Sequence, residues 1–289
     1  MLTGNAWLAV DLLERGDRVG VDAQMEAFEA GARRLRQPQY SWQATVWRAM
    51  ISLMEGRLAD AEQLAQDALS IGMRQDAITA GQYYAGQLLA IRREQLSLIE
   101  LEQAAREMVS AHEDRPIWRL ALVILLCDGG RLEEARSALE PFTEQFVRTL
   151  TQDLDWTMTM TVLAEAAVIL DDRPRARLLY ELLAPHTGTV CLIGAGAVCR
   201  GPLDSYLGVL ALTAGERETA LTHLRAAIEL ERRIGAPLQL AYTQIEYARA
   251  LGPGEQARAL LREARTGAAT LSVPRLERRT EVVVELLKA

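Results

Sequence analysis

Apolar residues recur along most of the chain at steps of three and four, the spacing that places them on one face of an α-helix. A clear case follows Gly56, where one helical face would carry Leu58, Ala61, Leu64, Ala65, Ala68 and Leu69. Comparable apolar periods lie before and after each of a series of turn signals. We expect these turns near Gly16, Gly56, Leu96, Gly130, Asp171, Gly215 and Gly252. The pattern therefore predicts one pair of helices around each turn.

The sequence around the turns is itself repeated. Residues 55–62 (EGRLADAE) recur at 129–136 (GGRLEEAR) and more loosely at 214–220 (AGERETA). Five positions after most turns stands a small residue, which lets the second helix of a pair pack close against the first. These residues are Ala61, Ala135, Ala176, Ala220 and Ala257, whereas Val21 and Leu101 are larger exceptions.

Proline marks several expected helix starts, because its fixed φ and missing N–H suit the first turn of a helix. Such prolines are Pro38, Pro116, Pro202, Pro237 and Pro274. The segment 274–287 is predicted to be a capping helix that covers the last pair. Residues 1–289 are thus expected to form a single all-α domain, a right-handed α-solenoid of about seven helical hairpins with a C-terminal cap.

Composition and charge limit the cellular location and the classes of partner that we expect. Hydrophobic residues make up 49% of the chain and charged residues 25%, enough to build a core. A net charge of -7 argues against nonspecific nucleic-acid binding, which needs clustered cations. The N-terminus shows no signal-peptide pattern, no stretch suits a membrane span, and three cysteines form no secretory framework. We therefore expect a cytoplasmic protein without a direct nucleic-acid or membrane partner.

Four segments carry a family resemblance: 11–17 (DLLERGD), 47–50 (WRAM), 180–185 (YELLAP) and 206–211 (YLGVLA). They resemble the C-terminal tetratricopeptide (TPR) regions of large actinobacterial regulators, namely ATPase-linked, cyclase-like proteins and LuxR-type or MalT-like activators. The resemblance implies a TPR-like helical array that senses or docks partners. The chain departs from those regulators because it has no G-x-x-x-x-G-K-[ST] phosphate loop, cyclase domain or recognisable helix-turn-helix.

Two segments suggest chemistry of other kinds. The stretch 194–201 (GAGAVCRG) looks like a glycine-rich phosphate cradle, but it lacks a preceding strand in a βαβ unit. We expect a small-residue loop or a tight helix contact instead, with the glycines used for close backbone packing. His186, Cys191 and Cys199 have zinc-compatible donors, yet their spacing fits no known pattern and a fourth ligand is missing. We predict neither a cofactor nor a metal site.

The concave surface of a helical array is formed by the first helix of each pair, where related arrays hold peptides or small ligands. Trp156 is added because an aromatic beside Asp153 and Asp155 could anchor a ligand. The complete set of binding candidates is Gln43, Met50, Tyr83, Asp128, Trp156, Glu165, Ser205, Tyr242, Glu246 and Arg249.

Three functional hypotheses follow. The first is a binding module in regulation or signalling that docks a peptide, a protein partner or a small ligand on its concave face. The second is a solenoid with a closed pocket that binds a natural-product-like molecule or acts on it as an enzyme, with Glu165, Asp155 or Tyr242 as acid–base groups. The third is a homo-oligomeric scaffold. An open groove would favour docking, whereas a cavity with a carboxyl of displaced pKa would favour the second hypothesis.

Overall fold

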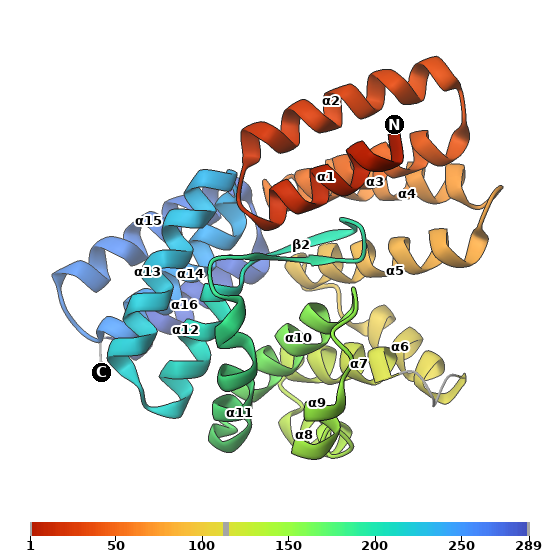
Figure 1. Cartoon of the computed structure of the whole chain (residues 1–289). Helices are drawn as coiled ribbons and strands as arrows, with labels where there is room; N and C mark the ends of the chain where they lie inside the picture. Colours follow the sequence, from red (N-terminus) through yellow and green to blue (C-terminus); the bar gives the residue numbers. More distant parts are fainter. Residues whose placement is uncertain (1, 112–115, 288–289) are drawn as a thin grey trace.

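The computed structural model describes residues 2–111 and 116–287 and confirms the predicted all-α class. Helices follow one another along nearly the whole described chain (Figure 1). At each of the seven positions predicted as turns, one helix ends and the next begins. The paired helices are α1 (Leu2–Glu14) and α2 (Arg18–Leu35), α3 (Pro38–Met54) and α4 (Leu58–Gly72), α5 (Ala77–Glu94) and α6 (Ile99–Ala111), α7 (Pro116–Asp128) and α8 (Leu132–Leu139), α10 (Trp156–Ile169) and α11 (Arg173–Leu183), α12 (Leu203–Ala214) and α13 (Arg217–Ile234), and α14 (Pro237–Leu251) and α15 (Glu255–Leu271).

Three further helical segments stand outside these pairs. They are α9 (Glu144–Thr149), the short 3-10 turn η1 (Ala184–His186) and α16 (Pro274–Leu286), the segment predicted as a cap. No helix in 2–111 or 116–287 is long and apolar enough to cross a membrane.

Six of the seven turns share one backbone device, and the turn at Gly252 lacks it because Pro253 has no N–H to donate. Gly16 and Gly56 adopt φ values of 73° and 77°, in the left-handed region that glycine enters without steric cost. The next N–H then donates back to a carbonyl five residues earlier, from Asp17 to Leu12 and from Arg57 to Ser52. Because this pattern satisfies carbonyls that a helix end would leave unpaired, it ends the first helix and reverses the chain.

The small residues after the turns lie where the helices of a pair meet. Ala61, Ala135, Ala176 and Ala220 are fully buried, and Ala257 is 1% exposed. In the α12–α13 pair a methyl group added at Gly208 would meet Leu224 Cγ at 2.5 Å, so this pair has no spare room. The alanine positions therefore set the close approach that the repeat pattern predicts.

Replacing Ala61 with leucine is expected to lower the free energy of unfolding by about 1–3 kcal/mol, because three extra carbon atoms must enter a filled contact. Ala59→Leu on the exposed face of the same helix is the matched control and should change stability by less than about 0.5 kcal/mol. Urea denaturation of the two variants measures the difference. Equal midpoints would show that Ala61 does not sit in a tight helix contact.

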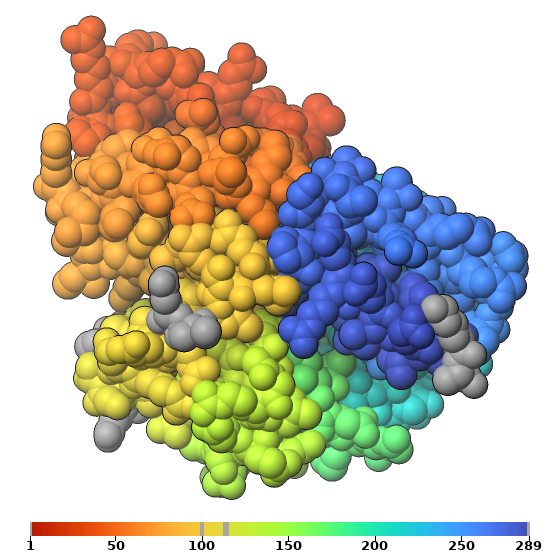
Figure 2. All heavy atoms as spheres, turned by 180° about the vertical axis from the view of Figure 1, so that it is seen from behind, coloured from red at the N-terminus to blue at the C-terminus, as the bar shows by residue number. Residues whose placement is uncertain are grey.

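Helices from the N-terminal and C-terminal parts of the chain lie against each other (Figures 1 and 2). Arg18, at the start of α2, donates to the Ile234 carbonyl at the end of α13 at 3.1 Å, and Arg233 Nε donates to the Gly16 carbonyl at 3.1 Å. At the other end, α16 contacts α14 and α15, as a cap should, and also α5. The helices therefore surround a central space instead of leaving an open array.

One element of the fold was not predicted. Residues 190–202 form a β-hairpin, with strand β1 (Val190–Ile193) antiparallel to β2 (Val198–Pro202) and a bulge between Cys191 and Leu192. Figure 1 shows the hairpin in the middle of the molecule, with helices around it. Its apolar side chains join the core of the N-terminal helices, where Val190, Leu192 and Cys199 are buried in the same cluster as Trp47 and Leu230.

Candidate functional site

The tip of the β-hairpin is held by side chains of α3 and α5. The Ala195 carbonyl accepts hydrogen bonds from Trp47 Nε1 at 2.9 Å and from Gln43 Nε2 at 3.2 Å. The Ala195 N–H donates to the Tyr83 hydroxyl at 3.1 Å. A buried amide, Gln87, donates both to the Val46 carbonyl and to the Ala197 carbonyl. The hairpin thus receives the polar contacts that these helices would otherwise offer to a peptide backbone.

This arrangement explains the glycines of the 194–201 stretch. Gly194 and Gly196 have φ values of 53° and 85°, and they form the turn between the strands. A methyl group added at Gly196 would lie 2.9 Å from Trp47 Nε1 and 3.7 Å from Met50 Sδ. The expected close backbone packing is therefore present, and the strand that precedes the stretch belongs to an antiparallel hairpin and not to a βαβ unit. Three binding candidates, Gln43, Met50 and Tyr83, face this turn.

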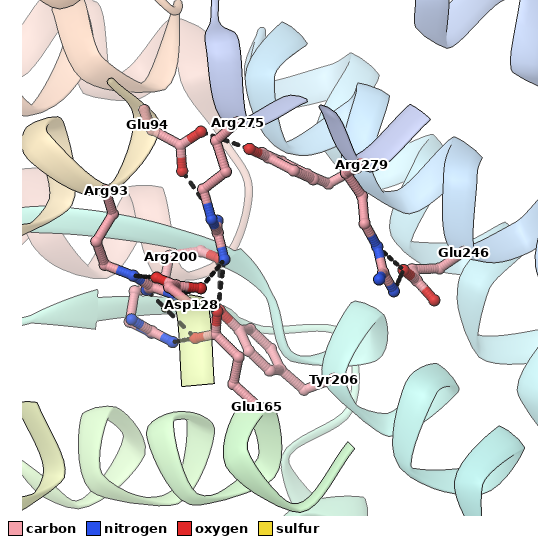
Figure 3. A network of polar contacts seen from close by, with 10 residues as sticks. Arg93, Glu94, Asp128, Glu165, Arg200, Tyr206, Glu246, Arg275 and Arg279 are labelled. Carbon is pink, nitrogen blue, oxygen red and sulfur yellow. Dashed lines mark hydrogen bonds and ion pairs between the residues drawn. The ribbon is translucent and has the colours of Figure 1, made fainter. Parts of the chain in front are cut away.

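Beside the hairpin lies a network of charged side chains from six elements (Figure 3). Glu165 of α10 pairs with Arg93 of α5 at 2.6 Å, with Arg200 of β2 at 2.9 Å and with Arg275 of α16 at 3.2 Å. Asp128, the last residue of α7, pairs with Arg93 at 2.6 Å and with Arg275 at 3.1 Å. The network joins helices that are distant in sequence.

The same network continues to α14. Arg275 also pairs with Glu94 at 3.1 Å, and the Tyr242 hydroxyl donates to the other oxygen of Glu94 at 2.5 Å. A second cluster lies next to it, in which Glu246 pairs with Arg249 at 2.7 Å and with Arg279 at 2.5 Å. All of these carboxylates therefore have at least one arginine partner.

Burial and charge compete at these groups. Burial raises the pKa of the Glu165 carboxyl, but Arg93, Arg200 and Arg275 outweigh it and hold this pKa well below the ordinary value. Burial raises the pKa of the Glu246 carboxyl too, and Arg279 and Arg249 overcome that effect in the same way. Both carboxylates are ionised at neutral pH.

The space left between the hairpin, the network and α16 is a cavity of about 430 Å³. It is lined by α3, α5, α7, α10, α12 and α14, each the first helix of its pair, together with β2, α13 and α16. Arg278 and the 46% exposed Val282 lie where the cavity meets solvent. Its apolar walls include Leu53, Ala90, Val168, Ile169, Val198, Val209, Leu224 and Leu238.

The structure brings half of the predicted binding candidates to this cavity: Asp128, Glu165, Ser205, Tyr242 and Glu246. Arg249 is linked to it through Glu246. Trp156 lies elsewhere, because it is buried at the start of α10 with its ring 4.9 Å from that of His186. Five candidates chosen because they stand on first helices thus line this cavity, whereas Trp156 does not, and their role in binding stays a prediction.

Among the cavity residues that sequence reasoning missed are Glu231 and Gln239. Glu231 is 1% exposed, and its Oε1 accepts a hydrogen bond from the Thr243 hydroxyl at 2.7 Å. Its Oε2 and the Oε1 of Gln239 are buried without a hydrogen-bond partner among the described residues. Burial raises the pKa of the Glu231 carboxyl to about 8, against small opposing effects from Thr243 and Arg232. In the sequence Glu231 looks like part of a solvated charged face, since Arg232 and Arg233 follow it.

The acid–base groups proposed from the sequence are poorly tuned for that role. A general acid or base works best with a pKa near the operating pH. The pKa of Glu165 is far too low, and burial and Glu94 raise the pKa of Tyr242 well above its ordinary value. Burial and Asp153 raise the pKa of Asp155, which does not line the cavity. Glu231 is the carboxyl in this wall whose pKa lies near neutrality.

Of the suggested zinc donors, Cys199 lines the cavity but His186 does not. Burial raises the pKa of the Cys199 thiol to about 12, and His186 packs on Trp156. Within 2–111 and 116–287, no three His, Cys, Asp or Glu side chains are arranged to hold a metal ion.

A larger hollow of about 520 Å³ lies on another part of the surface, between α2, α3 and α4. Several of its walls are exposed charged side chains, including Asp22, Glu26 and Asp60. Water solvates such groups, and none of the predicted binding candidates lines this hollow, so the cavity beside the hairpin is the better candidate site.

No protein-family model matches this chain, and no curated protein is similar to it.

Proposed function

We propose that this protein is a regulatory TPR-like solenoid of about seven hairpins that binds a small molecule in the cavity beside its β-hairpin. The helix pairs around the predicted turns and the buried alanines after five of those turns support the TPR-like arrangement. The observation that carries the functional proposal is the cavity itself. Its volume falls in the range of about 300–1,000 Å³ that is typical of small-molecule sites.

The walls of the cavity support binding with defined geometry. Arg93 and Arg275 are each fixed by two or more ion pairs, and Arg200 is fixed by an ion pair to Glu165 and a hydrogen bond to Thr161, so their positions do not depend on a ligand. Apolar residues from six helices and β2 complete the lining. A small polar molecule with an apolar body would therefore meet preformed walls, which reduces the entropy cost of binding.

Peptide docking on the concave face is less well supported. The Ala195 backbone already occupies Gln43, Trp47 and Tyr83, groups that would serve an incoming peptide. A peptide would have to displace the hairpin, which shares a buried core with Trp47 and Leu230. A sensor that responds to a metabolite fits this geometry better, and the three free, buried cysteines fit a cytoplasmic setting.

The test is a thermal-shift screen of the purified protein against small molecules of neutral, cationic and anionic classes. We expect at least one compound to raise the midpoint of unfolding. A Val209→Trp variant, which places an indole in the cavity, should abolish that shift, whereas Val19→Trp at an 81% exposed position on α2 should not. If no compound shifts the wild type, or if Val209→Trp folds and responds normally, the cavity is not the binding site.

A further inference from the structure

Two acceptor atoms on residues that line the cavity lack partners among the described residues. A methyl group added at Gly201 would be 3.1 Å from Gln239 Cγ and 3.9 Å from Glu231 Oε1, so both side chains border the same glycine. Gln239 Nε2 donates to the Cys199 carbonyl at 3.3 Å, and a carbonyl can only accept. This contact fixes the amide orientation and leaves Gln239 Oε1 as a free acceptor, and Glu231 Oε2 is the second atom without a partner.

Buried polar atoms in native proteins almost always have hydrogen-bond partners. In the ionised state of Glu231 both atoms are acceptors without a partner among the described residues, and a donor in the cavity can satisfy them. The other acidic side chains of the wall do not share this property, because Glu94, Asp128, Glu165 and Glu246 all pair with arginines. Glu231 is the carboxyl of this wall that a ligand can reach without breaking an ion pair.

We infer that the cavity binds a small organic cation with several N–H donors, a guanidinium or primary ammonium group, whose charged end contacts Glu231 and Gln239. This inference rests on the proposed function, since it names the ligand class of the same cavity. The apolar walls, among them Leu53, Val198 and Leu238, would hold the body of the ligand.

The charges around Glu231 explain why a cation is preferred to a neutral donor. Glu231 faces the exposed Arg232 of its own helix and the neutral thiol of Cys199 in β2. Helix α14 contributes the hydroxyl of Thr243 and the amide of Gln239. Arg18 of α2 binds the Ile234 carbonyl near the end of α13. No ion pair to Glu231 forms among the described residues, so the buried carboxyl keeps its proton until a cation replaces it.

The exchange conserves charge. The proton of the Glu231 carboxyl leaves to solvent as the cation enters, and the new ion pair forms in a place where water is largely excluded. An anion in the interior of the cavity would instead require Arg275 or Arg279 to leave its carboxylate partners, since Arg278 lies at the mouth. Binding of the cation should therefore release about one proton at a pH below the pKa of Glu231, which is about 8.

The experiment is calorimetric titration with n-butylguanidinium, compared with the neutral n-butylurea and the anionic butanoate. The probe stays cationic throughout, since guanidinium groups are not deprotonated in this range. We expect n-butylguanidinium to bind at least about tenfold more weakly at pH 6 than at pH 8.5, because the ionised fraction of Glu231 falls about tenfold per pH unit below its pKa. Titrations in two buffers of different ionisation enthalpy should show the released proton at pH 6.

Two substitutions test the residues. Glu231→Gln and Gln239→Leu should each weaken n-butylguanidinium binding by about tenfold or more, since each removes an acceptor that a charged donor uses. Glu229→Gln, which alters an exposed glutamate on the same helix, should leave binding unchanged. If Glu231→Gln fails to fold, Gln239→Leu alone still decides the result.

Equal binding of n-butylguanidinium and n-butylurea, or tighter binding of butanoate, would overturn the inference. The proposed function would survive that result if another compound class still bound the wild type and lost binding in Val209→Trp. If no class bound, both proposals would fall.

Discussion

Replacing Glu165 with glutamine is expected to lower the free energy of unfolding by about 3–5 kcal/mol, the cost of removing one partner from a buried ion network. The side chain of Glu165 is only 20% exposed, and it is shared by Arg93, Arg200 and Arg275. Glutamine keeps the size but not the charge, so three guanidinium groups would be left with Asp128 and Glu94 alone. Urea denaturation near pH 7 measures the loss.

The matched control is Glu255→Gln, because Glu255 also pairs with two arginines but is 73% exposed. Water and salt screen such a surface pair, so we expect little change in stability. Equal losses in the two variants would show that the central network is as well solvated as the surface, and the preformed cavity wall would lose its physical basis.

Lowering the pH should reduce the difference in the free energy of unfolding between Glu165→Gln and the wild type. The folded protein holds the pKa of Glu165 below its ordinary value of 4.5, so the stabilisation is complete above about pH 4.5. It is lost as the pH falls further through the folded-state pKa, where the carboxyl binds a proton in both states. Denaturation of both proteins at a series of pH values below 5 measures this convergence.

Glu231→Gln is expected to have the opposite effect and to become stabilising as the pH rises. The folded wild type keeps the Glu231 proton up to about pH 8, whereas the unfolded chain releases it near 4.5. Between these values unfolding releases a proton, so wild-type stability falls by up to about 1.4 kcal/mol per pH unit, on the order of 4 kcal/mol from pH 5 to pH 8. The amide in Glu231→Gln does not titrate, so this variant does not lose stability in this way.

Urea denaturation of the wild type, Glu231→Gln and Glu229→Gln at pH 5, 6, 7 and 8 tests this expectation. As the pH increases, the free energies of unfolding of the wild type and of Glu229→Gln should fall together. That of Glu231→Gln should rise relative to both. Parallel profiles for all three proteins would mean that Glu231 is ionised in the folded state and has a partner. That result would also remove the support for cation binding at this position.

These expectations concern residues that the sequence ranked very differently. Glu165 was predicted as a groove residue because it stands on the first helix of its pair, and the structure places it at the centre of the ion network. Glu231 stands on a second helix, α13, which the same rule assigns to the outside. It reaches the cavity because α13 also packs against β2. A rule derived from helix pairs does not account for a strand that lies between the pairs.

The hairpin itself left a signal in the sequence that helical periodicity obscured. The run 189–193 (TVCLI) is rich in β-branched and apolar residues and is followed by glycines at 194 and 196, which is typical of a strand and a turn. Four or five residues are too few to decide between a buried strand and a buried helix by periodicity. The distinction depends on Trp47, Gln87 and Tyr83, which supply hydrogen bonds from more than a hundred residues away.

The sequence by itself determined the all-α class, the seven turns and the alanines that bring paired helices together, because each of these depends on residues within one or two helical turns. Only the tertiary structure decided that the N-terminal and C-terminal helices meet, that a hairpin fills part of the centre, and that Arg93, Arg200 and Arg275 converge on Glu165. Those features depend on distances between residues far apart in the chain. Local propensity does not encode such distances, and the charge of a side chain does not reveal whether water or another side chain will neutralise it.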